Sequence, residues 1–342
     1  MGSESLAVYR NVCPVVEVIM REILLAAALA AFIPGGGAVA QDFPSRTITI
    51  VAPFPAGGPA DAIARVVAEP MRAFLNQTVV IENVAGAGGN IGVGRVARAA
   101  PDGYTIGIGQ WSTHVVNQIT YSPPYNVLSD FEPVALLTIT PQMIISRKDF
   151  PAKDTKELVA WLKANPDKAN AASVGAAGGA QVSAMYFQKA TGTTFRFIPY
   201  RGGHPAKVDL LAGRVDLMFD MAANVFNQLR SGQIKGYAVM AKSRWHGLPD
   251  IPSVDELGMP GLHVAYWHAI WAPKGTPKPV IAKLNAAIQH ALADETARKR
   301  FAQLGQDIMP KQQQTPEALA AYHKAETEKW WPIVRELGLK AK

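Results

Sequence analysis

From residue 46 onward the sequence alternates short apolar runs with amphipathic stretches. The run Arg46–Ala52, RTITIVA, places an apolar residue at every second position, as a β-strand requires. The segment after the next turn, PADAIARVVAEPMRAFL, instead spaces its apolar residues as a helix does. The same order recurs along the chain, with strands predicted at TVVIEN, YTIGIG, VALLTIT, FRFIPY, VDLMFD and GYAVMA. Repeated strand–helix units predict an α/β fold with mostly parallel sheets and helices on both faces.

Two apolar segments interrupt this alternation and predict crossings between two lobes. They are PVALLTITPQMII, residues 133–145, and VAYWHAIWAP, residues 264–273. A chain that crosses near residue 141 and returns near 267 forms a discontinuous first domain around a continuous second one. The predicted boundaries are 43–141 and 267–342 for domain 1, and 142–266 for domain 2. Two crossing strands make a hinge, and a hinge between two α/β lobes leaves a central cleft.

The N-terminal region predicts an export signal. Ile23–Ile33, ILLAAALAAFI, is apolar but shorter than the roughly 20 residues that cross a bilayer. A helix-breaking PGGG follows it, and then the A-x-A cleavage pattern Ala38-Val39-Ala40. Residues 1–40 are therefore predicted to be a signal peptide cleaved after Ala40, of which residues 1–19 are a spurious extension. We expect the remaining chain to be periplasmic.

Composition narrows the chemistry that the chain can perform. The only cysteine, Cys13, lies in the predicted signal, so the exported chain would have no disulfide, thiolate nucleophile or cysteine–metal site. With 49% hydrophobic and 18% charged residues the chain is globular. The net charge of +7 is scattered along the sequence, whereas nucleic-acid binders concentrate it on one face. We expect no nucleic-acid partner, and we attribute the charge to solubility, with anion steering as an alternative.

The sequence lacks the common motifs of nucleotide binding and catalysis. PFPAGGPAD has neither the lysine nor the hydroxyl that a P-loop needs. A G-x-G-x-x-A string at Gly92–Ala97 falls inside a helical pattern, where it cannot act as a dinucleotide fingerprint. There is no G-x-S-x-G or H-E-x-x-H motif. His263 and His268 would face opposite sides of a strand, which favours structural roles. We therefore expect no enzyme, no metal site and no cofactor.

Two glycine-rich turns predict an anion-binding site. Gly57 and Gly58 lie where the first strand becomes the first helix, and Asp61 can hold early N–H groups of that helix. A helix start offers unpaired N–H groups and partial positive charge, and glycine lets a ligand approach the backbone. SVGAAGG, residues 173–179, repeats this arrangement in the second lobe. Taken singly, each is explained as an ordinary turn; taken together across a cleft, they predict capture of one carboxylate.

A series of strings resembles one protein family. PFPAGGPAD, VIENVAGAGGNIG, ARAAPDGYTIGIG, PYRGG, LLAGRVDLMFD, LPDIPSVDELGMPG and WAPKGTP occur in this order between Phe43 and the C-terminus. They are similar to the Bug-type extracytoplasmic solute-binding proteins of tripartite tricarboxylate transporters. The resemblance implies a periplasmic-binding-protein-like fold whose two loops, here Phe54–Asp61 and Ser173–Gln181, hold a carboxylate through backbone amides and ordered waters. It also implies membrane permease subunits as partners, and we expect the chain itself to be a monomer.

The chain departs from the family pattern at several cleft positions. Ala60 stands where the family usually has threonine, and Ala177 where it has glycine. Gln181 replaces histidine, which removes a titratable group but keeps donor and acceptor capacity. Met185 replaces an acidic residue in the same helix. The cleft is therefore predicted to be less polar on the side of the second turn.

Four residues at other strand ends are further candidates. Trp111 would favour an apolar or aromatic acid if it faces the cleft; the alternative is helix–sheet packing. Asp220 would contact an amine, hydroxyl or water on the ligand, or would cap the following helix. Tyr200 and Arg201 end another strand, where Arg201 would bind a second carboxylate or help close the cleft. The predicted ligand-binding residues are Phe54, Ala56, Gly57, Gly58, Asp61, Trp111, Ser173, Gly175, Ala176, Ala177, Gln181, Tyr200 and Asp220.

These patterns predict a periplasmic solute-binding protein that delivers a small carboxylate to a tripartite tricarboxylate-type transporter. One alternative is a ligand-sensing module that signals through a membrane receptor and uses the same cleft. A periplasmic enzyme acting on carboxylates is less favoured, because no nucleophile or metal constellation is visible. Dicarboxylates, amino acids, aromatic acids and cyclic acids all fit the predicted anion-binding site.

Overall fold

The computed structural model describes residues 43–341, and the predicted signal peptide, its cleavage site and Cys13 lie outside them. The strands are β1 (Ile48–Ala52), β2 (Val79–Asn83), β3 (Thr105–Gln110), β4 (Phe131–Arg147), β5 (Asn170–Val174), β6 (Arg196–Tyr200), β7 (Leu217–Met221), β8 (Ile234–Val239), β9 (Ala265–Pro273) and β10 (Asp307–Ile308).

The helices alternate with these strands, as the sequence pattern predicts. They are α2 (Pro59–Leu75), α3 (Asn90–Ala97), α4 (Asn117–Thr120), α5 (Thr155–Ala164), α6 (Gly179–Thr191), α7 (Gly203–Leu211), α8 (Ala222–Arg230), α9 (Lys278–Ala293), α10 (Glu295–Gln303) and α11 (Pro316–Glu336). Short turns of other helical types are η1 (Ala87–Gly89), η2 (Ser112–Val116) and η3 (Lys311–Gln313). The G-x-G-x-x-A string lies inside α3, so the prediction that it is helical is confirmed.

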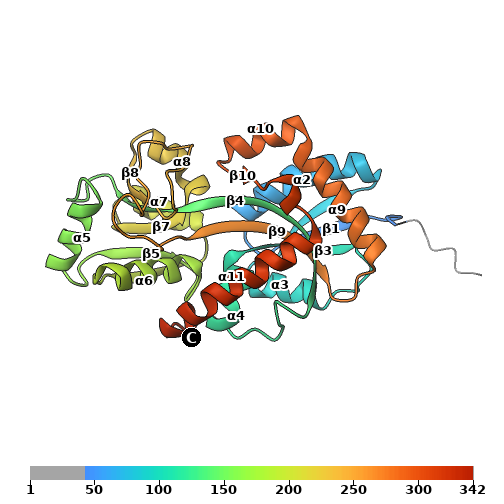
Figure 1. Cartoon of the computed structure of the whole chain (residues 1–342), viewed down its shortest axis with the longest axis horizontal. Coiled ribbons are helices and arrows are strands. Elements are labelled where there is room, and N and C mark those ends of the chain that lie inside the picture. The colour runs from blue at the N-terminus through green and yellow to red at the C-terminus, as the bar shows by residue number, and fades with distance from the viewer. Residues whose placement is uncertain (1–42, 342) are drawn as a thin grey trace, which may run out of the picture. The chain divides into compact units, whose positions relative to one another are not determined.

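The sheet runs in the order β2-β1-β3-β9-β4-β7-β5-β6, with β8 and β10 also paired to β4 (Figure 1). The ladders among β1, β2 and β3 are parallel, as are those among β5, β6 and β7. We call β1–β3 and β10 with α2, α3, α9 and α10 the first lobe, and β5–β8 with α5–α8 and the loop after β8, residues 240–264, the second lobe. The long strand β4 joins them: residues 131–141 pair with β9, and residues 142–147 pair with β7 and β8.

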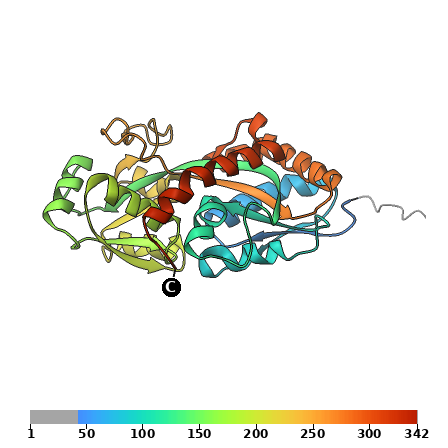
Figure 2. The same cartoon turned by 60° about the horizontal axis from the view of Figure 1, so that its bottom comes forward.

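Each lobe has its own hydrophobic core, and a third core runs between them. Ile50 and Met71 belong to the first-lobe core, and Met143 and Leu210 to the second-lobe core. The third core lies along β4 and β9 and includes the fully buried Trp267. Helix α11 runs lengthwise over this region (Figure 2) and packs on β4. The domain limits at residues 141 and 267 stay a prediction, but β4 and β9 lie where the two crossing segments are predicted.

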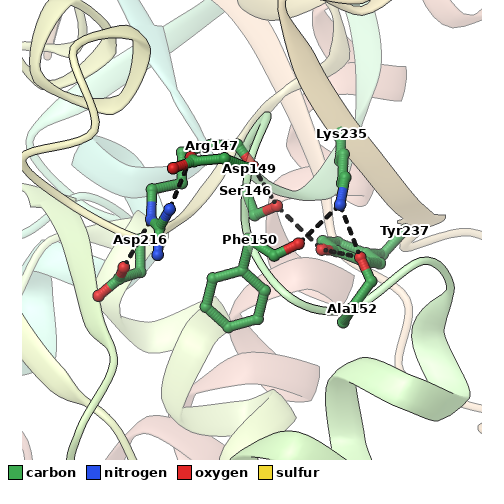
Figure 3. Close-up of polar contacts among 8 residues, drawn as sticks. All are labelled: Ser146, Arg147, Asp149, Phe150, Ala152, Asp216, Lys235 and Tyr237. Atoms are coloured by element: carbon green, nitrogen blue, oxygen red, sulfur yellow. Dashed lines mark hydrogen bonds and ion pairs between the residues drawn. The ribbon is translucent and has the colours of Figure 1, made fainter.

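A buried polar network closes the end of the second lobe where β4 leaves the sheet (Figure 3). The Tyr237 hydroxyl lies 2.9 Å from the Ser146 hydroxyl and donates to the Ala152 carbonyl at 3.1 Å. The Lys235 ammonium donates to the carbonyls of Phe150 and Ala152 at 2.6 and 3.1 Å. These bonds fix the chain between β4 and α5 against β8, so that the second lobe has a rigid far end.

Tyr237→Phe is expected to destabilise the protein by about 1–2 kcal/mol, because it removes a buried hydroxyl from two hydrogen-bonded partners. Tyr186→Phe is the matched control, since the Tyr186 hydroxyl donates to the Gly261 carbonyl at an exposed position. Urea unfolding measures both changes. Equal free energies of unfolding for the two variants would show that the network does not stabilise the lobe.

Within residues 43–341, no helix combines the length and apolar character needed to cross a membrane.

Candidate functional site

The first glycine-rich turn joins β1 to α2 and leaves several backbone donors free. Gly57 has a φ of 80°, in the region that favours glycine. Gly58, the residue before α2, is extended and caps the helix with no side chain. Within the described part of the chain, the N–H groups of Gly58, Ala60 and Asp61 donate to no partner. These groups point outward from a helix start, where partial positive charge attracts an anion.

Asp61 holds this turn in shape. Its side chain is 4% exposed, and Oδ2 accepts from the Gly57 N–H at 2.9 Å. The Arg65 guanidinium donates from Nε to both carboxylate oxygens at 3.0 Å. Burial opposes ionisation, but the bonds from Arg65 and Gly57 outweigh it and hold the pKa of Asp61 below its usual value. The carboxylate is therefore ionised, and its charge is balanced by Arg65.

The second turn joins β5 to α6 and has the same construction. Ala177 has a φ of 58°, unusual for a residue with a side chain, and Gly178 is extended without a side-chain cap. The Ala177 N–H donates to Gln181 Oε1 at 2.9 Å. Among the residues described, the N–H groups of Gly179 and Ala180 donate to no partner. This turn thus offers a second helix start with free donors.

The two turns match position by position. Gly57 and Ala177 have positive φ, and an extended glycine follows each. In each turn the N–H of the positive-φ residue donates to a side chain four residues later, Asp61 in the first and Gln181 in the second. Gln181 therefore braces its own turn through Oε1, as Asp61 does, with a neutral group in place of a charged one.

The second turn packs against the start of η2, and Gly89 of η1 lies between η2 and Phe54 of the first turn. A Cβ placed on Gly89 would lie 2.7 Å from Thr113 Cγ2 and 3.2 Å from the Phe54 ring of the first turn. A Cβ placed on Gly179 would lie 2.8 Å from the Trp111 ring and 3.0 Å from the Ser112 Cβ. Residues 111–113 thus contact the second turn directly and approach the first turn through Gly89, and neither Gly89 nor Gly179 has room for a Cβ.

A hydrogen bond joins the lobes at the same place. The Tyr121 hydroxyl, at the end of α4 in the chain that follows β3, donates to the Ala176 carbonyl of the second turn at 2.5 Å. A Cβ on Gly88 would lie 2.8 Å from this hydroxyl, and one on Gly175 would lie 3.2 Å from it. The glycine loop before α3 therefore makes room for Tyr121 and for the second turn. Sequence patterns do not predict this contact, because Tyr121 and Ala176 belong to no common motif.

The structure places the remaining candidates around α6, with different surroundings. Trp111 is fully buried and packs edge-on against Tyr266 and Trp330, at ring distances of 5.1 and 4.8 Å. In this structure Trp111 therefore packs between neighbouring elements, as the second of its two predicted roles has it. Its ring also lies next to Gly179 at the start of α6. The Tyr200 carbonyl accepts from the Gly175 N–H at 2.8 Å, but its hydroxyl donates to Asp209, away from the turn.

Asp220 lies at the end of β7 and is 6% exposed. Its Oδ1 accepts from the Met221 N–H at 2.8 Å, and Oδ2 accepts from the Asn224 side chain. Burial raises the pKa of Asp220 to about 6, against the effect of these bonds. Burial, together with the nearby Asp220 carboxylate, also raises the pKa of Tyr266, whose hydroxyl would lie 2.4 Å from a Cβ on Gly179. Asp220 and Tyr266 are thus close to one another beside the α6 start.

The other titratable candidates have structural surroundings. His268 is fully buried in β9, and His263 pairs with Asp255 at 2.6 Å. Arg201 is exposed. Between residues 43 and 341, no group of three or more histidine, cysteine or acidic side chains is arranged to hold a metal ion.

Most of the described chain matches one protein family. Residues 63–339 match the model of the tripartite tricarboxylate transporter family receptor. The chain belongs to this receptor family. An Agrobacterium vitis UPF0065 protein from the TAR-I ttuE-ttuC' intergenic region is 38% identical over 93% of this chain and 92% of its own length. Protein BugT of Bordetella pertussis is 33% identical over 93% of this chain and 98% of its own.

Solved structures confirm the predicted family and fold class. The periplasmic binding protein BugD is 41% identical and superimposes with a TM-score of 0.82, covering 88% of this receptor-family chain and all of BugD. MatC from Rhodopseudomonas palustris, solved with bound malate, is 38% identical with a TM-score of 0.81, over 85% of this chain and all of MatC. Rpa4515 of R. palustris, solved with adipate, is 28% identical with a TM-score of 0.81, over 87% of this chain and 99% of its own.

Proposed function

We propose that this chain is a periplasmic solute-binding protein that captures a small carboxylate between its two lobes. The observation that carries the proposal is the matched pair of turns, Phe54–Asp61 and Ser173–Gln181. Each turn presents free N–H groups at a helix start; residues 111–113 contact the second turn and approach the first through Gly89. Two such helix starts supply donors and partial positive charge to one carboxylate without a charged side chain. The malate and adipate in two related structures agree with this ligand class.

The thirteen residues named from the sequence have different roles in this proposal. Ala56, Gly57, Gly58, Gly175 and Ala176 give the ligand access to the backbone, Phe54 forms an apolar wall, and the buried Trp111 packs behind the start of α6. Asp61, Ala177 and Gln181 keep the turns in shape, as their hydrogen bonds support. Ser173, Tyr200 and Asp220 border the second turn. After capture, the protein delivers the acid to the membrane subunits of a tripartite tricarboxylate transporter.

We assign no catalytic role to the hydroxyl and imidazole that lie beside the turns. Thr113 Oγ1 and His114 Nδ1 are 3.0 Å apart, a distance that a nucleophile and base would need. Both side chains are buried, however, and the Thr113 hydroxyl also bonds the Gln110 carbonyl. Burial, with a smaller effect of His323, lowers the pKa of His114 well below its ordinary value. A structural role fits this pair better than hydrolysis of the ligand.

The test is a thermal-shift screen of the purified protein with malate, adipate and other small acids, each beside its amide. An acid present at a hundredfold its dissociation constant adds about 2.7 kcal/mol of stability, whereas its amide adds little. Gly57→Ala should abolish the shift, since its added methyl group stands in open space at the backbone that the ligand approaches.

Gly232→Ala is the matched control for this variant. Gly232 also has a positive φ, 65°, and open space around it, but it lies in the turn between α8 and β8. Both variants carry the same backbone strain, of about 1 kcal/mol. If the thermal shift with an acid is the same in Gly57→Ala and Gly232→Ala, the first turn is not the carboxylate-binding site. A panel without any shift would count against carboxylate capture itself.

A further inference from the structure

A second large recess lies between the lobes and shares no residue with the two turns. Its volume is about 1120 Å³. The first lobe contributes α9, α10 and β10 to its walls, and the second lobe contributes Phe226 of α8 and residues 245–247. Figure 1 labels α8 and α10, two of the elements whose residues line it. We call it the α8–α10 groove.

The two walls of the α8–α10 groove are tied together at its base. The Trp245 Nε1–H donates to Asp307 Oδ2 at 3.0 Å, and His246 Nε2 lies 2.6 Å from Asp307 Oδ1. A Cβ on Gly305 would lie 3.0 Å from the Ala223 Cα, so the chain before β10 touches the start of α8. Because each contact joins one lobe to the other, the width of the groove depends on the angle between them.

The side chains of the groove combine positive charge with aromatic surface. Arg298, Lys299 and Lys311 line it, are exposed, and make no ion pair with any described residue. Phe74 is 43% exposed on the same surface, and its ring lies 5.2 Å from that of His290, another residue of the groove. The acidic lining residue, Asp307, is already bonded to Trp245 and His246. This surface is complementary to carboxylates next to apolar side chains.

We propose that the α8–α10 groove docks an acidic, partly apolar segment of the membrane permease. The proposal rests on the transport function proposed above. At about 1120 Å³ the groove lies at the upper end of the roughly 300–1,000 Å³ of small-molecule pockets, so it has room for a short polypeptide segment. A recess with walls on two sides also fits a protruding segment better than a flat layer of anionic lipid headgroups. Because the walls belong to different lobes, the docked segment senses how far the lobes have closed.

The test measures binding of the purified protein to nanodiscs that hold the membrane subunits encoded with it. The groove variant carries Arg298→Glu, Lys299→Glu and Lys311→Glu. The control variant carries Lys156→Glu, Lys163→Glu and Lys168→Glu, three exposed lysines around α5 that make no ion pair with a described residue. We expect the groove variant to bind about tenfold more weakly or worse, and the control to bind like wild type, because buried rather than distant charges set the off-rate.

Several results would overturn this assignment. They are undiminished binding of the groove variant, equal loss in both variants, absence of binding by the wild-type protein, or equal binding to anionic-lipid nanodiscs without subunits. A thermal shift with malate or adipate measures ligand capture separately. If no variant responds to any acid while docking is lost only in the groove variant, the docking surface stands and the proposed capture function fails.

Discussion

Gly179→Ala is expected to weaken carboxylate binding by about tenfold or more. Gly179 is the first residue of α6, and a methyl group there would lie 2.4 Å from the Tyr266 hydroxyl, 2.8 Å from the Trp111 ring and 3.0 Å from the Ser112 Cβ. Three neighbours at such distances cannot all give way, so the α6 start must move off η2. The free N–H groups of the second turn then no longer face the first turn.

Gly202→Ala is the control for this substitution. Gly202 likewise lies at a helix start in the second lobe, as the residue before α7. A methyl group there would meet only Pro205 Cδ, at 4.0 Å. Dissociation constants from calorimetry, with malate and adipate as the first probes, separate a binding effect from a loss of stability. Unchanged affinity in Gly179→Ala would mean that α6 does not lie against η2 in the bound protein.

The elements around these turns were predictable because their signals are local. The period-two run of β1, the helical spacing of α2 and the glycines between them each occupy a short stretch of chain, and the structure has them in that order. The two crossing segments were recognisable for the same reason, since β4 and β9 are long apolar strands where the rest of the chain alternates.

The packing of the site depended on contacts that sequence spacing does not encode. Tyr121 donates to Ala176, and Trp111 packs on Trp330, between segments far apart in the chain. From the sequence, Trp111 could either face the cleft or pack between helix and sheet. The structure shows it fully buried in the third core. The bracing bond of Gln181 had a usable signal, however: its four-residue separation from Ala177 repeats that of Asp61 from Gly57.

We expect the protein to lose stability as the pH falls below about 6.5, before ordinary carboxylates begin to titrate. Burial lowers the pKa of His268 to about 3 and of His323 to about 4, and it also lowers the pKa of His114. Each folded pKa lies below the unfolded value of about 6.5. Below that pH the unfolded chain therefore binds more protons, and stability falls until the folded pKa is reached. Each histidine costs about 1.4 kcal/mol per pH unit within this window.

Two buried carboxyl groups oppose this loss. Burial raises the pKa of Asp220 to about 6, and it raises the pKa of Glu326, against the bond from Trp267. Such groups take up a proton more readily in the folded state, so they add stability as the pH falls towards their unfolded values. Three histidines against two carboxyl groups leave a net loss of stability as the pH falls from 7 to 4.5.

His268→Leu should reduce this pH dependence by about 1.4 kcal/mol per pH unit between pH 5 and pH 6. The His268 side chain is fully buried, and neither ring nitrogen bonds a described residue, so leucine removes a titrating group without removing a hydrogen bond. His204→Leu, at an exposed position of α7, is the control and should keep the wild-type slope. Urea unfolding at several pH values gives the slopes directly. An unchanged slope in His268→Leu would mean that this imidazole is protonated equally in both states, and the acid sensitivity would then have to come from His114 and His323.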